Sequence, residues 1–280
     1  AVYDRDGDKM PEAVFVGDLS GKMWRVDYNK TNGLWEKAYG NQPLYTPSGT
    51  GAPITAAPVI TQTGGHLYVV AGTGQYFSLA DISPSVQNYA LGLFADQGPI
   101  TDADLLGQNF IDNGKEVDAI YSSNKTLTQK IYQVSQNAIQ SHHKGWRLKL
   151  LQGQAIVSQP AIRRNKVTTF TAVRTTPTGN VCSVNGSTAL IAVDLKNGGQ
   201  YDLPAFDTNK DGRFDNRDKV GGMLEIGGVI APVNTSRKST LNGNISVRNV
   251  LAGDIATVDV PMNTFDDSPF IRRISWREIF

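Results

Sequence analysis

Short apolar runs separated by turn residues recur along the chain and predict β-hairpins. Ala13 to Gly17 (AVFVG) and Lys22 to Asp27 (KMWRVD) are apolar or alternating, and Asp-Leu-Ser-Gly joins them as a turn. Ala57 to Thr61 (APVIT) and Leu67 to Gly72 (LYVVAG) repeat this arrangement around a Gly-Gly pair. Little of the chain has a helical period, so the pattern predicts an all-β protein.

A third unit extends this pattern to three strands. Ser158 to Ile162 (SQPAI) and Thr168 to Val173 (TTFTAV) form its hairpin, and Ala189 to Asp194 (ALIAVD), followed by Lys-Asn-Gly-Gly, completes it. The units share a loose order of a proline-containing segment, a turn, an apolar strand and a strand ending in Val-Asp. Such imperfect repetition is typical of propeller blades, so we expect residues 1–280 to form the C-terminal part of a single β-propeller domain.

Two stretches interrupt the repeats. Residues 96–124 are polar, with aspartate and asparagine in several places, and we expect an insertion between strands there. Thr126 to His143 fits two structures, because its apolar residues roughly follow a helical stripe whereas TLTQKIYQVS alternates. We favour strands for this stretch.

Length and charge narrow the classes of partner. The 280 residues are enough for one all-β domain with a full core. The 27 basic and 26 acidic residues are interspersed and give a net charge of +1, so we expect neither nucleic acid nor an anionic membrane surface as a partner. No run has the length of a membrane span, and the start AVYDRDGDK has no signal-peptide core, so any export signal would lie upstream.

The cysteine and histidines do not suggest a catalytic site. Cys182 is the single cysteine, so no internal disulfide can form, and we expect a small buried thiol or a bridge to a segment outside this chain. His142 and His143 lie in a polar stretch and His66 in a Gly-Gly turn, where all three should be exposed. They lack metal-ligand spacing with one another.

One acidic loop, residues 207–218 (DTNKDGRFDNRD), has the spacing of a calcium site. Calcium takes about six to eight oxygen ligands, which such a loop supplies from side chains at positions 1, 3, 5, 9 and 12 and from a carbonyl at position 7. The side-chain positions are filled by Asp207, Asn209, Asp211, Asp215 and Asp218, and Arg213 offers the carbonyl. Gly212 at position 6 suits a sharp turn. Asp218 replaces the usual glutamate, so its mode of coordination stays open, and a solvated turn is the alternative.

A second acidic loop lies at residues 4–12 and leads directly into AVFVG. Its expected ligands are Asp4, Asp6, Asp8, the carbonyl of Met10, and Glu12 at position 9. The alternative is a solvated turn. Together the loops gather eight carboxylates, four in each, and such clusters oppose compaction unless a cation neutralises them. We therefore expect Ca²⁺ as the cofactor, and its removal should loosen both loops.

Four stretches, taken in order, carry a resemblance to a known family. They are DRDGDKMPEAVFVGDLSGKMWRVD (Asp4 to Asp27), GTGQYFSLAD (Gly72 to Asp81), GWRLKLLQGQAIVSQPAI (Gly145 to Ile162) and RRISWREIF (Arg272 to Phe280). Together with the second acidic loop at Asp207, this ordered set resembles the C-terminal propeller of the PilC/PilY family of type IV pilus assembly and tip adhesin proteins. The resemblance covers most of the chain.

The resemblance implies a modified, quinoprotein-like propeller without enzymatic activity. It implies a calcium-binding pilus biogenesis factor and tip or cell-surface adhesin, exported through the periplasm to the outer membrane or pilus tip. Such a protein would support pilus extension, twitching motility and attachment. Its implied partners are minor pilins of the tip complex, a host or surface receptor, and the upstream part of the same protein. In the family several blades precede the first acidic loop, so we expect an incomplete set of blades here.

Two other functions fit a propeller. A quinoprotein dehydrogenase would need acids, a base and stacking aromatic rings around a cofactor pocket, but the tryptophans are better explained by packing within blades: Trp24, Trp35, Trp146 and Trp276. A carbohydrate-binding propeller would instead use exposed aromatic residues such as Tyr76, Phe77 and Tyr89.

Overall fold

The computed structural model describes residues 1–76, 81, 87–122, 125–177, 184–227, 233–239, 245–253 and 256–263. In this part of the chain, strands make up nearly all of the regular structure. The exceptions are α1 (Ala38–Asn41), which contains residues with positive φ, and the 3₁₀ turn η2 (Asp102–Asp104). Neither has the length and apolar character of a membrane span. The all-β prediction is therefore confirmed.

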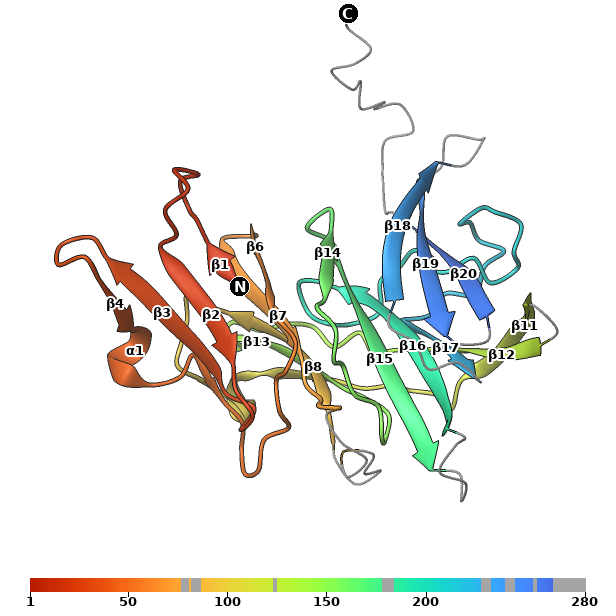
Figure 1. Cartoon of the computed structure of the whole chain (residues 1–280), viewed down its shortest axis with the longest axis horizontal. Helices are drawn as coiled ribbons and strands as arrows, with labels where there is room; N and C mark the ends of the chain where they lie inside the picture. Colours follow the sequence, from red (N-terminus) through yellow and green to blue (C-terminus); the bar gives the residue numbers. More distant parts are fainter. Residues whose placement is uncertain are drawn as a thin grey trace, which may run out of the picture.

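The described strands form four sheets, which lie roughly in sequence order across the molecule (Figure 1). The first sheet has the order β1-β2-β3-β5-β9, with β4 on β3: β1 (Val2–Tyr3), β2 (Ala13–Gly17), β3 (Met23–Asn29), β4 (Leu34–Lys37), β5 (Tyr45–Thr46) and β9 (Ile100–Thr101). The second has the order β10-β13-β8-β7-β6: β6 (Val59–Thr63), β7 (His66–Gly72), β8 (Tyr89–Phe94), β10 (Leu106–Gln108) and β13 (Gly145–Lys149).

The remaining strands form the third and fourth sheets. The third has the order β11-β12-β17-β16-β15-β14: β11 (Lys115–Ser122), β12 (Lys125–Tyr132), β14 (Ala161–Arg163), β15 (Val167–Pro177), β16 (Val184–Asp194) and β17 (Met223–Gly227). The fourth has the order β18-β19-β20: β18 (Val233–Ser239), β19 (Ile245–Gly253) and β20 (Ala256–Asn263). Several separate sheets of this kind are consistent with a propeller-like arrangement.

The three predicted hairpin units are present. β2 pairs antiparallel with β3, β6 with β7, and β15 with both β14 and β16. Alternation is therefore sufficient to find these strands, because each hairpin partner is close in sequence.

The polar stretch 96–124 differs from the prediction. Instead of forming an insertion, it contributes β9 to the first sheet, β10 to the second and β11 to the third. β9 pairs in parallel with β5 and β10 with β13, so both depend on partners distant in sequence, which local patterning does not reveal. The strand interpretation of Thr126 to His143 is confirmed by β12, although this stretch holds one strand, paired with β11 and β17, and not a strand pair.

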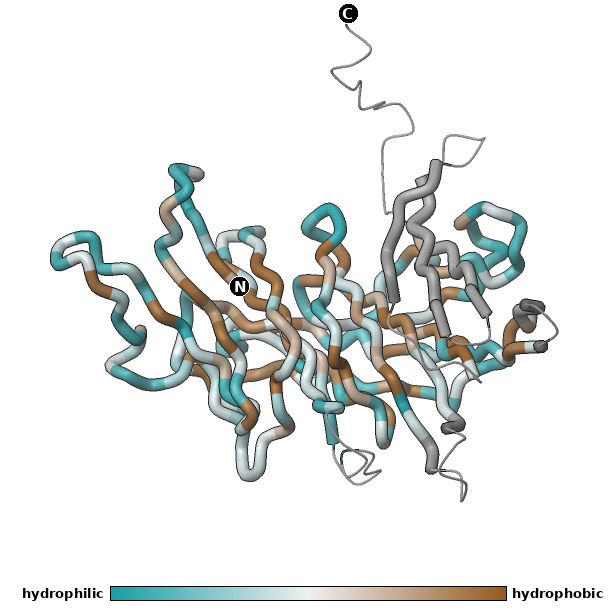
Figure 2. Tube along the Cα trace, viewed as in Figure 1, coloured by the Kyte–Doolittle hydropathy of each residue, from teal (hydrophilic) through white to brown (hydrophobic). Residues whose placement is uncertain are grey.

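Successive sheets pack face to face through separate apolar cores. On β7, Leu67 and Val69 contact the cluster that contains Phe15 of the first sheet. The alternate residues Tyr68 and Val70 belong to the cluster shared with the third sheet. β16 divides its side chains in the same way between two cores. In Figure 2 hydrophobic positions accordingly follow the strands, and hydrophilic ones the loops. The second and third sheets are thus buried on both faces, as continuous apolar strands require.

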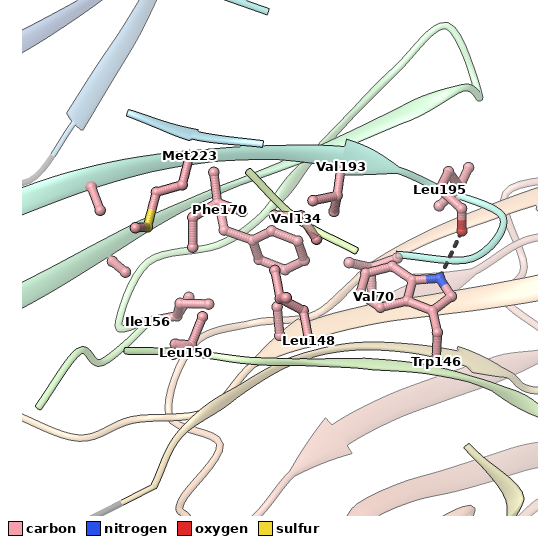
Figure 3. Close-up of a cluster of buried hydrophobic side chains, with 14 of the residues drawn as sticks. Val70, Val134, Trp146, Leu148, Leu150, Ile156, Phe170, Val193, Leu195 and Met223 are labelled. Carbon is pink, nitrogen blue, oxygen red and sulfur yellow. Dashed lines mark hydrogen bonds between the residues drawn. The ribbon is translucent and has the colours of Figure 1, made fainter. Parts of the chain in front are cut away.

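Trp146 of β13 joins the second and third sheets (Figure 3). Its ring is fully buried, and Nε1 donates a hydrogen bond to the carbonyl of Leu195, 2.8 Å away. Two glycines make room for the ring, since a Cβ on Gly92 would lie 2.3 Å from Cε2 and one on Gly198 would lie 2.2 Å from Cε3. The bulky indole therefore fits only because both neighbours lack side chains.

The outer face of the first sheet is largely apolar, although Lys37 also lies on it, over the ring of Trp24. Strand register places on it Val2, Val14, Val16, Trp24, Val26, Tyr28 and Trp35. Val2, Val16 and Trp35 are 62%, 50% and 47% exposed, whereas Phe15 on the opposite face is fully buried. An apolar face of this size, uncovered within the described residues, is typical of a surface that packs against another element.

Candidate calcium loops

The first acidic loop connects β1 to β2 and projects beyond these strands (Figure 1). Carboxylate oxygens of Asp4, Asp6, Asp8 and Glu12 lie within 4.8 Å of one another. The structure thus brings together the four carboxylates that the sequence predicts as ligands, and such an oxygen-only donor set fits Ca²⁺.

Main-chain hydrogen bonds shape this loop. Counting from its first aspartate, the position 1 carboxylate of Asp4 accepts from the N–H of Lys9 at 3.0 Å. The carboxylate of Asp6 accepts from the N–H of Asp8 at 3.3 Å, and that of Asp8 from Met10 at 2.7 Å. Each acceptor folds the following residues back around its own side chain, which directs the carboxylates inward.

Glu12 closes the first loop. Its Oε2 accepts the N–H of Arg5, at position 2, with a distance of 2.6 Å. Its Oε1 lies 3.3 Å from Nζ of Lys30, which is also 3.7 Å from Asp6. The hydrogen bond to Glu12 raises the pKa of Lys30. This basic side chain comes from the turn after β3, so it bridges positions 3 and 9 from outside the loop.

The second loop, residues 207–218, repeats the same pattern of hydrogen bonds. Asp207 accepts from the N–H of Gly212 at 2.9 Å, Asn209 from Asp211 at 3.0 Å, and Asp211 from Arg213 at 2.9 Å. These bonds join positions 1 and 6, 3 and 5, and 5 and 7, as in the first loop. The loop lies against two distant strands, because Phe206 bridges to Met262 of β20 and the Lys210 side chain reaches β11.

Positions 4 and 6 have positive φ in both loops. In the first loop they are Gly7 (φ 77°) and Lys9 (φ 70°), and in the second they are Lys210 (φ 59°) and Gly212 (φ 77°). Glycine and lysine have therefore exchanged places within one backbone conformation. Only one position in each loop carries the residue that adopts this conformation without strain.

Asp218 closes the second loop in the way that Glu12 closes the first. The side chain is buried, and its Oδ1 accepts the N–H of Thr208, again at position 2, with a distance of 2.7 Å. Its Oδ2 accepts the N–H of Asp215 at 3.1 Å. Both oxygens thus already have donors, and the side chain holds the ends of the loop together.

The negative charge of the second loop is neutralised in a different way from that of the first. Within the described residues they do not form a cluster comparable to that of the first loop. Arg217 instead contacts Asp211 at 2.8 Å and Asp215 at 2.6 Å, and its hydrogen bond lowers the pKa of Asp215 to about 2. Burial raises the pKa of Asp207, whose Oδ1 is buried without a hydrogen-bond partner. An unsatisfied buried carboxylate oxygen beside other acidic ligands also fits a cation.

Lys30 and Arg217 are the residues that sequence reasoning missed. Arg217 lies two residues after a predicted ligand and one before another, so its position could have suggested an ion pair. Lys30 lies 18 residues from Glu12, and only the pairing of β2 with β3 brings them together.

The remaining candidate residues do not gather at one site. His142 is exposed as expected, but His66 and His143 are half-buried. His66 stacks on Phe94 and lies 2.9 Å from Asp96. Trp146 lies in the core as predicted, but Trp24 and Trp35 lie on the outer face of the first sheet. Tyr76 is exposed, whereas Tyr89 is half-buried beneath Arg147. Phe77, Cys182, Trp276 and the terminal RRISWREIF stretch lie outside the described residues.

Comparisons with known proteins agree with the family resemblance. No family model matches the chain. A type IV pilus biogenesis factor PilY1 homolog from Xylella fastidiosa is 24% identical over 294 residues, covering 99% of this chain and 22% of that protein. Type IV pilus biogenesis factor PilY1 from Pseudomonas aeruginosa is 24% identical over 258 residues, covering 76% of this chain and 22% of that protein. The chain thus spans about a fifth of the length of these relatives.

The fold agrees as well. The crystal structure of the Pseudomonas aeruginosa PilY1 C-terminal domain matches with a TM-score of 0.70 and 21% sequence identity, over 95% of this chain and 60% of that one. The relatives that are similar to this chain in sequence are named as biogenesis factors and not as enzymes. Along nearly its whole length, this chain is similar to PilY1 proteins and has the fold of the PilY1 C-terminal domain.

Proposed function

We propose that this chain is a calcium-binding, non-enzymatic module of a type IV pilus biogenesis factor. The observation that carries the proposal is the similarity to a protein named as such a factor across 99% of the chain. The match to the solved PilY1 C-terminal domain supports it independently through the fold. Because the chain spans 22% of the length of these relatives, the activity of the whole protein comes to it only through this proposal.

Calcium is assigned to both acidic loops. In the first, the proposed ligands are the clustered carboxylates of Asp4, Asp6, Asp8 and Glu12 with the carbonyl of Met10. In the second, they are Asp207, Asn209, Asp211, Asp215 and the carbonyl of Arg213. Asp218, whose oxygens both accept main-chain hydrogen bonds, serves as a brace. Bound calcium would neutralise each cluster and fix each loop on its β scaffold.

The same proposal places the protein outside the cytoplasm, at the pilus tip or outer membrane. There it would support pilus extension against retraction, twitching motility and attachment, with minor pilins and a host or surface receptor as partners. The first loop projects beyond β1 and β2 (Figure 1), and most of its residues are exposed, so a partner could contact it and bound calcium could change the strength of that contact.

The upstream part of the same protein is proposed to cover the outer face of the first sheet. Three interfaces already join consecutive sheets of this chain, and this face has the same apolar character. In a version extended by the upstream region of the relatives, acrylamide should quench the fluorescence of Trp24 and Trp35 less than in this chain. Equal quenching in both would contradict that packing.

The pilus role is tested by deletion in the bacterium that encodes the chain. Removing these residues from the full protein should reduce surface pili while pilin remains in the cell. Restoring the wild-type sequence should return piliation, and a variant with Asp6→Asn and Asp8→Asn should return less of it if calcium matters. Normal piliation and twitching after deletion would contradict the proposal. A pull-down with minor pilins, with and without calcium, would test the partners.

A further inference from the structure

Arg217 occupies the part of the second loop where a cation would bind. Its guanidinium lies 2.8 Å from Oδ2 of Asp211 and 2.6 Å from Oδ2 of Asp215, at positions 5 and 9. Its Nε lies 3.1 Å from the other oxygen of Asp215, so the contact between the guanidinium and that carboxylate is bidentate. Charge-assisted contacts of this kind are stronger than hydrogen bonds between neutral groups.

We propose that Arg217 is an internal counter-cation that competes with calcium and sets the calcium affinity of the second loop. Asp211 has one oxygen engaged by the N–H of Arg213, and Arg217 contacts the other oxygen, which also accepts a 3.3 Å hydrogen bond from the side-chain amide of Asn209. A calcium ion needs the same oxygens of Asp211 and Asp215. Binding is therefore an exchange of one cation for another, and the inference rests on the proposed calcium function.

The first loop has a weaker counterpart. Lys30 reaches Glu12 at 3.3 Å and Asp6 at 3.7 Å, and both distances are longer than those from Arg217 to Asp211 and Asp215. A single ammonium at these distances competes less well than a guanidinium with a bidentate contact. Calcium should therefore fill the first loop at lower concentration than the second. Arg217 would in turn keep the second loop folded when calcium is scarce.

The test measures calcium binding to the second loop alone. In the full chain, Asp6→Asn and Asp8→Asn disable the first loop, and calorimetric titration with calcium chloride reports on the second. Two variants are compared in this background. Arg217→Gln removes both the positive charge and the bidentate guanidinium, whereas Arg217→Lys keeps the charge. Lys219→Gln is the matched control, because Lys219 is exposed, directly follows the loop and bonds a carbonyl of β11.

Arg217→Gln should bind calcium about five- to tenfold more tightly, since both the competing contact and a nearby positive charge are lost. Lys219→Gln should change affinity by about twofold at most, because its charge is screened by salt. Arg217→Lys should fall between them. In chelator, Arg217→Gln should melt at a lower temperature than the background protein, and calcium should restore the difference.

Two results would overturn the proposal. If Arg217→Gln binds no more tightly than Lys219→Gln, Arg217 does not compete, while the calcium function still stands. If none of the variants binds calcium, both the competition and the calcium assignment of this loop fail. Binding by Arg217→Gln but not by the background protein would support competition in its strongest form. The pilus role is untouched by any of these outcomes.

Discussion

The two acidic loops reach the same backbone conformation from different residues. Both place positive φ at positions 4 and 6, but glycine fills position 4 in the first loop and position 6 in the second. The three hydrogen bonds from aspartate or asparagine side chains to main-chain N–H groups are the shared feature. The side-chain acceptors, more than the glycines, therefore define the loop.

The loops differ in how they are closed and how their charge is balanced. The first ends on Glu12 at position 9, a half-buried residue paired with a lysine from another turn. The second ends on the buried Asp218 at position 12 and carries its own arginine. The first loop thus depends more on an added cation, and the second on its own contacts.

The largest effect is expected from removing the closing residues in chelator. Asp218→Ala should lower the free energy of unfolding by about 2 to 4 kcal/mol, because it leaves buried N–H groups of the loop without acceptors. Glu12→Ala should cost about 1 kcal/mol, since water can reach the group that it frees. Urea denaturation measures both. Equal costs would remove the distinction between the loops.

The next largest effect is expected from removing calcium, and it should differ between the two loops. Ligand at about 100 times its dissociation constant stabilises a folded protein by about 2.7 kcal/mol per site. With the first loop disabled by Asp6→Asn and Asp8→Asn, most of the calcium-dependent rise in melting temperature should disappear. With the second disabled by Asp207→Asn and Asp211→Asn, most of it should remain at low calcium concentration. If disabling the second loop removed more of the calcium-dependent stabilisation than disabling the first, the first loop would not be the one that depends more on calcium.

Gly212→Ala should cost about 1 kcal/mol in the free energy of unfolding. The φ of 77° is unfavourable for alanine, whereas a Cβ there would meet no atom within 4 Å, so the cost is one of backbone conformation alone. Chemical denaturation of this variant beside Gly107→Ala, which is equally open but has no positive φ, isolates the effect. No difference between the two variants would show that position 6 is not restrictive.

Lys9→Gly should give the smallest change, a gain of about 0.5 kcal/mol. It relieves a lysine held at φ 70°, while the added freedom of the unfolded chain offsets part of the benefit. The same denaturation measurement applies. A loss of stability would mean that the Lys9 side chain contributes a contact that outweighs its strained backbone.

The sequence predicted what depends on neighbours along the chain. AVFVG and KMWRVD are recognisable as a hairpin because their alternation and turn are local, and the ligand spacing of both loops is local as well. The short strands β9 and β10 were not predicted, since each pairs in parallel with a distant strand. The contact of Lys30 with Glu12 and the hydrogen bonds of Asp218 to the N–H groups of its own loop were not predicted either, because both depend on the folded geometry of the loops. Spacing shows which side chains are present but not which N–H groups they accept.

The packing of Trp146 against Gly92 and Gly198 also restricts how this sequence can evolve. Any side chain at either glycine would overlap the indole ring, and a smaller residue at 146 would leave a cavity and an unpaired carbonyl at Leu195. The three positions therefore form one epistatic unit. A substitution at a glycine becomes tolerable only after the tryptophan has been replaced, so the order of mutations, and not only their identity, decides which descendants fold.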